Sequence, residues 1–197
     1  MESRPNSKSI KTNEKRLFKR LISERQLENI LDWEFEDGFA YHVISEGDID
    51  ALSFLKHILK QQALEYLACS TWCMAMADIV EIERYLELKR ILRLDTYVGE
   101  IFKGTYMTEY SALWDLHNYW GGRVAIFRNH SKVFCGFGEK FDFVIETSAN
   151  INGNPRAENT VITINRNLAL FYKDFFDNII DYQKEFQDWK PYQLCNT

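Results

Sequence analysis

Residues 129–159 gather most of the side chains in this chain that could carry out chemistry. The stretch reads NHSKVFCGFGEKFDFVIETSANINGNPRAEN and places His130, Lys132, Ser148, Asn150 and Glu158 around two short apolar runs. An imidazole can act as an acid, a base or a nucleophile near neutral pH, and ammonium, hydroxyl and amide groups can donate hydrogen bonds beside it. From these residues alone, the stretch is either a strand hairpin with polar ends or an active site.

The elements that position these residues can be predicted from hydrophobic periodicity. Apolar side chains at helical spacing predict helices over residues 15–31, 48–61, 77–90, 109–120 and 167–186. β-prone runs predict strands over residues 41–44, 64–72, 91–98, 123–127, 132–137, 141–147 and 160–164. We expect Ser45 to cap the second helix and Gly121 to end the fourth.

The order of these elements predicts the fold class. Helices and strands alternate first, and strands then follow one another, which is typical of an α/β fold with a mixed β-sheet flanked by helices on both faces. The two apolar runs of the 129–159 stretch would lie in the middle of that sheet. Its polar residues would then emerge at the ends of core strands, where a scaffold can hold them rigidly.

Length and composition indicate a single globular domain with an appended arm. The chain has 197 residues, of which 46% are hydrophobic, with nine Gly and three Pro, so it can bury a core. Its net charge of −5 argues against indiscriminate nucleic-acid binding, because that affinity comes mostly from neutralising phosphates. The first 20 residues nevertheless carry seven basic and two acidic side chains, about +5, which leaves about −10 for the remainder. This basic arm is either a solvated terminal segment or a contact for an anionic polymer.

Several classes of protein are disfavoured by what the sequence lacks. No apolar run approaches the ~20 residues that span a bilayer, and the N-terminal residues show no secretory core, so we expect a cytoplasmic protein without membrane association. The four cysteines have no metal-binding spacing and are expected to be reduced and mostly buried. We expect neither a metal nor a cofactor. Asn129 begins a match to the glycosylation sequon, which has no meaning without secretion.

Two short motifs carry a resemblance to a known family. HSK, with His130 and Lys132, precedes one predicted strand, and SAN, with Ser148 and Asn150, follows the next. Together they resemble the HxK and SxN halves of the phospholipase D superfamily motif, as found in its single-motif, nuclease-like members. The resemblance implies a phospholipase D-like half over residues 33–190, preceded by a basic helical arm at 1–32 and followed by a tail at 191–197.

The resemblance also implies roles for the candidate residues. In this family a neutral imidazole attacks a phosphodiester to give a covalent phosphohistidine, and a second histidine protonates the leaving alkoxide. His130 would supply the nucleophile or the acid, while Lys132, Ser148 and Asn150 would bind phosphate oxygens. Glu158 would orient the His130 ring through its other nitrogen.

The histidine count predicts the assembly. The chain has four histidines, and none but His130 begins an HxK motif, so one chain holds half of a family-type site. Single-motif members of the family pair two identical chains. If this chain is active, the resemblance therefore implies a C2 homodimer in which two His130 residues face each other.

The sequence departs from the family motif at two positions, and this leaves two functions open. Phe137 stands where the family has an Asp five residues after the Lys, and Thr147 stands where a Gly usually precedes the Ser; Asp142 is a possible substitute for the missing carboxylate. The first hypothesis is a phosphodiesterase, a hydrolase of the endonuclease type acting on nucleic acid. The second is a catalytically degraded phospholipase D-like module that serves nucleic-acid binding or assembly.

Overall fold

The structure is a computed structural model, and it describes residues 24–31, 34–151 and 156–195. Its centre is a seven-stranded mixed sheet with the strand order β1-β7-β6-β5-β2-β3-β4. The strands are β1 (Ala40–Ser45), β2 (Leu64–Thr71), β3 (Leu94–Gly99), β4 (Val124–Phe127), β5 (Val133–Gly138), β6 (Phe143–Thr147) and β7 (Glu158–Ile164). The named helices are α2 (Ala51–Gln61), α3 (Met76–Glu87), α4 (Phe102–Thr105), α5 (Met107–Trp120) and α6 (Arg166–Asp177).

The sheet has a parallel part and an antiparallel part. β2, β3 and β4 run parallel, and the helical connections through α3 and through α4 and α5 supply the crossovers that parallel neighbours need. β5, β6, β7 and β1 pair antiparallel in turn, starting from β2. The strands of the 129–159 stretch, β5 and β6, therefore lie in the middle of the sheet, as predicted.

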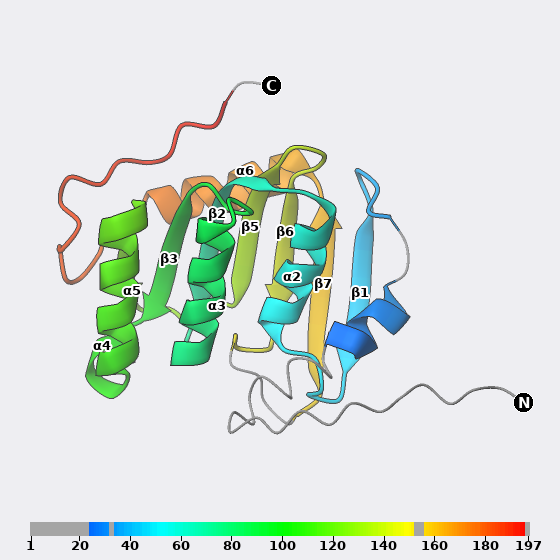
Figure 1. Cartoon of the computed structure of the whole chain (residues 1–197), viewed down its shortest axis with the longest axis horizontal. Helices are drawn as coiled ribbons and strands as arrows, with labels where there is room; N and C mark the ends of the chain where they lie inside the picture. The colour runs from blue at the N-terminus through cyan, green and yellow to red at the C-terminus, as the bar shows by residue number, and fades with distance from the viewer. Residues whose placement is uncertain (1–23, 32–33, 152–155, 196–197) are drawn as a thin grey trace, which may run out of the picture.

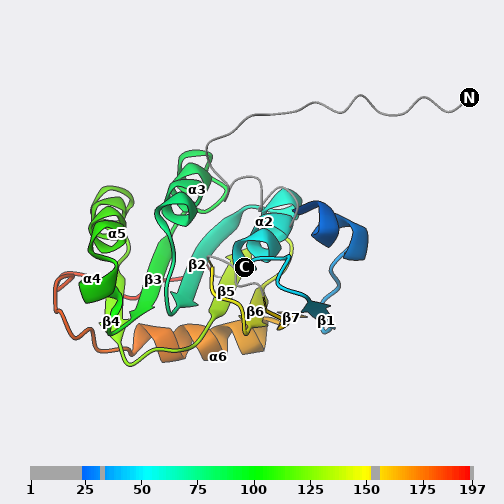
Figure 2. The same cartoon turned by 90° about the horizontal axis from the view of Figure 1, so that it is seen from below.

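Helices cover both faces of the sheet. α2, α3 and α5 lie on one face, and α6 crosses the other (Figures 1 and 2). Two buried clusters fill the layers. The larger includes Leu55, Ile82 and Leu113 from the three-helix face, and the smaller includes Tyr66, Phe137 and Phe176 on the α6 face. The predicted α/β class, a mixed sheet flanked on both faces, is confirmed.

The start of α2 differs from the prediction. Ser45 does not cap this helix, because it is the last residue of β1 and pairs with Glu158 of β7. The cap is Asp50, whose carboxylate accepts a hydrogen bond from the backbone N–H of Ser53 at 2.8 Å. The helix consequently begins at Ala51, because the β1–β7 pairing holds the chain in extended conformation up to Ser45.

The end of α6 also differs from the prediction. The helix stops at Asp177 instead of continuing to residue 186. Beyond it, the backbone N–H of Tyr182 donates to the carbonyl of Ile126 in β4, and the Asp181 carboxylate accepts from the N–H of Ile126, both at 2.9 Å. Because these hydrogen bonds to β4 hold residues 181–182, the segment does not continue as a helix despite its helical periodicity. Phe186 then packs beside Trp114 and His117 of α5, on the other side of the sheet.

The C-terminal segment returns across one end of the sheet (Figure 1). Trp189 lies 3.6 Å from the Arg123 guanidinium and donates a 3.0 Å hydrogen bond to the buried Asp95. Tyr192 stacks on Tyr66 with ring centroids 5.4 Å apart. Most of the predicted basic arm, residues 1–23, lies outside the described residues, while residues 24–30 are helical. The division into 1–32, 33–190 and 191–197 stays a prediction.

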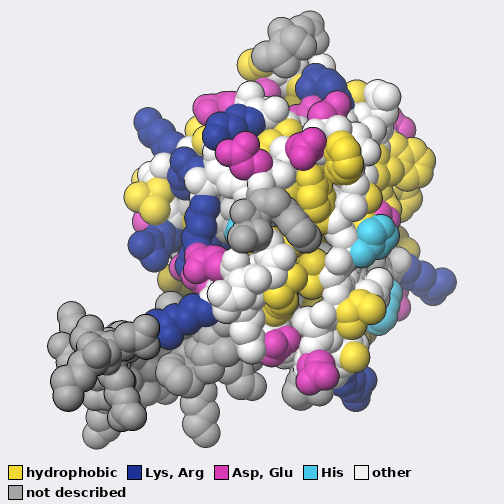
Figure 3. Space-filling view, turned by 90° about the vertical axis from the view of Figure 1, so that its right-hand side faces the viewer, with side chains coloured by type: hydrophobic (Ala, Val, Ile, Leu, Met, Phe, Trp, Pro, Cys, Tyr) yellow, Lys and Arg dark blue, Asp and Glu magenta, His cyan; other side chains and the backbone are white. Residues whose placement is uncertain are grey.

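The surface on the β1 side is chemically mixed (Figure 3). Hydrophobic side chains are visible there beside both acidic and basic ones. His42 and Ile44 of β1 are exposed, and Ile44 has 81% of its surface accessible. Because the two signs of charge are interspersed, this view of the described residues contains no continuous basic stripe.

Candidate active site at one end of the sheet

The topology brings the predicted site residues to one end of the sheet. His130 and Lys132 precede β5, Ser148 and Asn150 follow β6, and Glu158 begins β7. β5, β6 and β7 are successively antiparallel, so the start of β5, the end of β6 and the start of β7 share an end. The ends of β2 and β3 reach the same place, because Ser70 of β2 pairs with Val133. We call this the site end of the sheet.

His130 and Lys132 are in direct contact. The Lys132 ammonium lies 3.2 Å from Nδ1 of His130 and donates a 2.7 Å hydrogen bond to the carbonyl of the same residue. The imidazole is exposed, whereas Lys132 is only 9% exposed. Burial lowers the pKa of Lys132, and the charges of Cys73 and Glu158 oppose that shift. A cation held in a partly desolvated position beside an exposed imidazole can attract an anionic group to that imidazole.

Ser148 and Glu158 form a second contact. The Ser148 hydroxyl donates to the Glu158 carboxylate and accepts from the backbone N–H of Asn159 at 3.1 Å. The backbone N–H of Ser148 donates to the carbonyl of Asn159 at 3.0 Å. This exchange continues the β6–β7 ladder beyond Thr147, and Glu158 is 9% exposed. The hydroxyl of Ser148 is therefore fixed by both strands.

The two contacts belong to one site. The backbone N–H of Thr147 donates to the carbonyl of Lys132 at 3.1 Å, so the residue before Ser148 is tied to the HSK segment. The charge of the Glu158 carboxylate also favours the charged form of Lys132, although burial keeps the pKa of Lys132 below its ordinary value. Asn150 contributes a buried Oδ1 that has no hydrogen-bond partner in the part of the chain that the structure describes.

Glu158 has a partner other than the predicted one. It was expected to orient His130, but its hydrogen bond comes from Ser148, and within residues 34–151 and 156–195 no hydrogen bond joins it to the imidazole. The contact at Nδ1 of His130 is made by Lys132 instead. An orienting role for Glu158 stays a prediction.

The two departures from the family motif have separate structural settings. Phe137 is 2% exposed and packs against Tyr66 in the core beneath α6, with ring centroids 6.1 Å apart. Asp142 lies at the turn between β5 and β6, where it accepts from the N–H of Gly138 and pairs with Arg166 at 2.7 Å. Both residues are toward the far end of β5 from His130, so neither can contact a phosphate held there. Thr147 accepts a hydrogen bond from the N–H of Ala149 at the site end.

Two further residues at the site end, Asn129 and Trp72, were not predicted to belong to the site. Asn129 is 7% exposed and bonds to Ser70 of β2 and to the Tyr97 carbonyl of β3. Trp72 follows β2, and its ring centroid lies 5.7 Å from that of His130. The only sequence signal for these contacts is position, since Asn129 precedes the HSK motif and Trp72 ends an apolar run.

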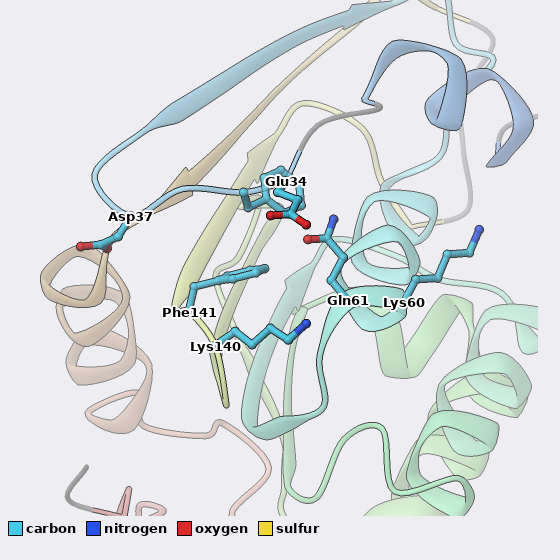
Figure 4. Close-up of a pocket in the computed structure, with 7 residues that line it drawn as sticks. Glu34, Asp37, Lys60, Gln61, Lys140 and Phe141 are labelled. Carbon is cyan, nitrogen blue, oxygen red and sulfur yellow. The ribbon is translucent and has the colours of Figure 1, made fainter.

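The described part of the chain has further features away from this site. A cavity of about 340 Å³ lies toward the opposite end of the sheet, where Figure 4 shows Glu34, Gln61 and Lys140 pointing toward one space. No cluster of three or more His, Cys, Asp or Glu side chains able to hold a metal occurs in the described part of the chain. The four cysteines are free, and three of them are buried. Among the helices described, none combines the length and the apolar character needed to cross a bilayer.

The chain resembles known proteins in fold but not detectably in sequence. No family model and no curated protein sequence matches the chain. Solved structures do match. The phospholipase D family member Nuc from Salmonella typhimurium aligns over 79% of this chain and 99% of its own, at 16% identity and a TM-score of 0.52. The fold is phospholipase D-like.

Two further solved structures resemble the chain. TrmBL2, an archaeal chromatin protein whose structure shows a novel mode of DNA binding, aligns over 85% of this chain at 9% identity and a TM-score of 0.51. This chain spans 59% of the length of TrmBL2. A polyphosphate kinase from Porphyromonas gingivalis aligns over 87% of this chain and 29% of its own, at 18% identity and a TM-score of 0.48. Because these sequence identities are low, the similarities to Nuc and to TrmBL2 concern the fold alone.

Proposed function

We propose that this chain is a phospholipase D-like phosphodiesterase that cleaves nucleic acid through a phosphohistidine on His130 in a homodimeric site. The observation that supports it best is the contact of the Lys132 ammonium with His130, at the same end of the sheet as Ser148 and Asn150. Four side-chain types suited to holding and attacking a phosphodiester thus lie at one end of the sheet, although their two motifs are 16 residues apart, counting from Lys132 to Ser148.

The proposed chemistry needs two imidazoles. One His130 attacks phosphorus with a ring nitrogen that carries no proton, and a phosphorus–oxygen bond breaks as a nitrogen–phosphorus bond forms. The partner chain's copy of this histidine donates a proton to the leaving alkoxide and then takes a proton from the water that hydrolyses the phosphohistidine. Lys132, Ser148 and Asn150 stabilise the negative charge on the phosphate oxygens.

Nucleic acid is the proposed substrate class for two reasons. TrmBL2, an archaeal chromatin protein with a similar fold, has a structure that shows a novel mode of DNA binding. The first 20 residues carry seven basic side chains, which could bind a polyanion next to the acidic body. Neither reason distinguishes DNA from RNA.

The direct test is cleavage of labelled single- and double-stranded DNA and RNA by wild-type protein and by His130→Ala. The proposal predicts cleavage by the wild type and none by the variant, with both proteins equally folded and equally associated. The covalent step predicts a phosphorylated His130 that can be trapped by acid-free quenching and found by mass spectrometry. Wild-type protein that binds these polymers without cleaving them would favour the non-catalytic module instead.

A further inference from the structure

Asn129 lies at the junction of three strands at the site end of the sheet. It falls between β4 and β5, next to the ends of β2 and β3, and only 7% of its surface is exposed. Close packing reaches its backbone, because a Cβ added at Gly99 would lie 3.1 Å from the Asn129 carbonyl oxygen. A buried polar side chain at such a junction must find partners in the protein.

The side-chain amide of Asn129 uses both of its ends. Its Nδ2 donates to the Ser70 hydroxyl at 2.9 Å and to the Tyr97 carbonyl at 3.1 Å, with a longer contact of 3.4 Å to the Thr71 carbonyl. Its Oδ1 accepts from the backbone N–H of Ser131 at 2.9 Å and from the Ser131 hydroxyl at 2.7 Å. One amide therefore ties β2 and β3 to Ser131.

Ser131 is the middle residue of the HSK motif. Its hydroxyl also lies 2.7 Å from that of Ser70, which closes a ring of hydrogen bonds with Asn129. The Asn129 amide binds the backbone at Ser131. The exposed His130 directly precedes this position, and Lys132 directly follows it. Both reactive side chains thus project from a backbone segment that is held by one residue.

We infer that Asn129 is a positioning residue, which fixes the Ser131 backbone and thereby aims the His130 imidazole and the Lys132 ammonium at one phosphate. The effect of Asn129 on catalysis rests on the proposed function, whereas its effect on the geometry of the HSK segment does not depend on that function. An ordinary buried asparagine would stabilise the fold and nothing more. A positioning residue should also change the site while the fold persists, because a displacement of about 1 Å can cost about a hundredfold in rate.

The test compares Asn129→Ala and Asn129→Ser with a matched asparagine at the far end of the sheet. Asn165 also bonds a backbone N–H, that of Leu168 at 2.9 Å, and caps α6. We expect the Asn129 variants to lower kcat by about tenfold to a hundredfold with KM little changed, whereas Asn165→Ala loses stability and keeps kcat. Full kcat in a folded Asn129 variant, or an equal loss in Asn165→Ala, would overturn the inference.

A second readout needs no activity, so it separates this inference from the proposed function. In folded Asn129→Ala or Asn129→Ser, the Ser131 amide should exchange with solvent up to about tenfold faster, because its side-chain acceptor is lost or replaced by a shorter one. The His130 ring-nitrogen shifts in NMR spectra should move as well. If wild-type protein shows no cleavage but both spectral changes occur, the proposed function fails and the positioning geometry stands. Unchanged exchange and unchanged shifts would sink the inference in either case.

Discussion

The Lys132 ammonium lies 3.2 Å from Nδ1 of His130 while it donates to the carbonyl oxygen of the same residue. A charged ammonium can only donate, so Nδ1 accepts and a neutral ring then carries its hydrogen on Nε2. With Nδ1 engaged by Lys132 and a hydrogen on Nε2, neither ring nitrogen has a lone pair free to attack phosphorus. Binding of a phosphate by Lys132 would release Nδ1, and we expect substrate binding and the tautomer of His130 to be coupled.

Substitution of the anion-binding residues should slow the chemistry more than it harms the fold. Lys132→Ala and Asn150→Ala are each expected to lose roughly a hundredfold or more in kcat, the scale found when one preorganised donor to developing negative charge is removed. Lys140→Ala is the matched control, because this exposed lysine lies in the turn after β5, away from the site end. Cleavage rates at saturating substrate measure the effect. Equal rates in all three variants would exclude these roles.

Association should follow from the single HxK motif. We expect a C2 dimer that buries on the order of 1,600 Å² in total, with the two His130 side chains facing across the axis. Light scattering at micromolar concentration measures the mass, and His130→Ala should leave that mass unchanged. An active protein that remains monomeric at high concentration would contradict the two-histidine site.

Activity should not depend on a divalent ion. In the proposed phosphohistidine mechanism, Lys132, Ser148 and Asn150 stabilise the negative charge that develops on the phosphate oxygens, so the rate of cleavage should persist in EDTA. The assay is repeated with added magnesium or manganese as the control. Cleavage that appears only when one of these ions is present would show that the proposed mechanism is wrong, even with this fold.

Restoring the family carboxylate should damage the protein. Phe137→Asp would place a charge against Tyr66 in a core position that is 2% exposed, at an expected cost of about 3 kcal/mol or more in unfolding free energy. Phe137→Leu should cost less, because it remains apolar. Urea unfolding measures both. A Phe137→Asp variant that is stable and more active would mean that the missing Asp does limit the site.

His117 should contribute to loss of stability in acid. Burial lowers the pKa of His117 to about 3, and this neutral ring contacts the Thr96 hydroxyl at 2.9 Å. The unfolded chain, with a histidine pKa near 6.5, binds a proton that the folded chain does not take up between those values. Stability therefore falls as pH decreases through this window, by about 2 to 3 kcal/mol from this residue between pH 7 and pH 4.5.

The variant His117→Gln isolates that contribution. Glutamine does not titrate, so the difference in unfolding free energy between wild type and variant should shrink by the same amount between pH 7 and pH 4.5. Urea unfolding at the two pH values provides the measurement. A difference that stays constant would mean that His117 is protonated in the folded protein or that the ring is accessible to solvent.

Periodicity was sufficient to predict the sheet and its neighbouring helices, because their apolar faces repeat locally. It failed where distant segments compete. The helix predicted to run to residue 186 ends at Asp177, since Asp181 and Tyr182 bond to Ile126, 55 or more positions earlier. Ser45 is as good a cap as Asp50 by residue type, and only its pairing with β7 removes it from that role.

The placement of the candidate residues at one end of the sheet was predictable to a similar extent. His130 and Lys132 meet because they are two residues apart at the start of one strand, which a motif can signal. The partners of Asn129 cannot be read in this way, since Ser70 and Tyr97 lie 59 and 32 positions away. Glu158 lies at the site end as expected, but its choice of Ser148 depends on the register of β6 and β7, and no spacing rule specifies that register.

The hydrogen bonds of residues 181–182 to β4 also prevent this edge strand from pairing with another copy of the chain. β4 is the last strand in the sheet order, and an edge strand offers unpaired backbone groups to which another chain can add. The N–H and the carbonyl of Ile126 are both occupied, by Asp181 and Tyr182. A chain cut after residue 177 would expose these groups. It should therefore form intermolecular sheet and aggregate at concentrations at which the intact chain remains dispersed.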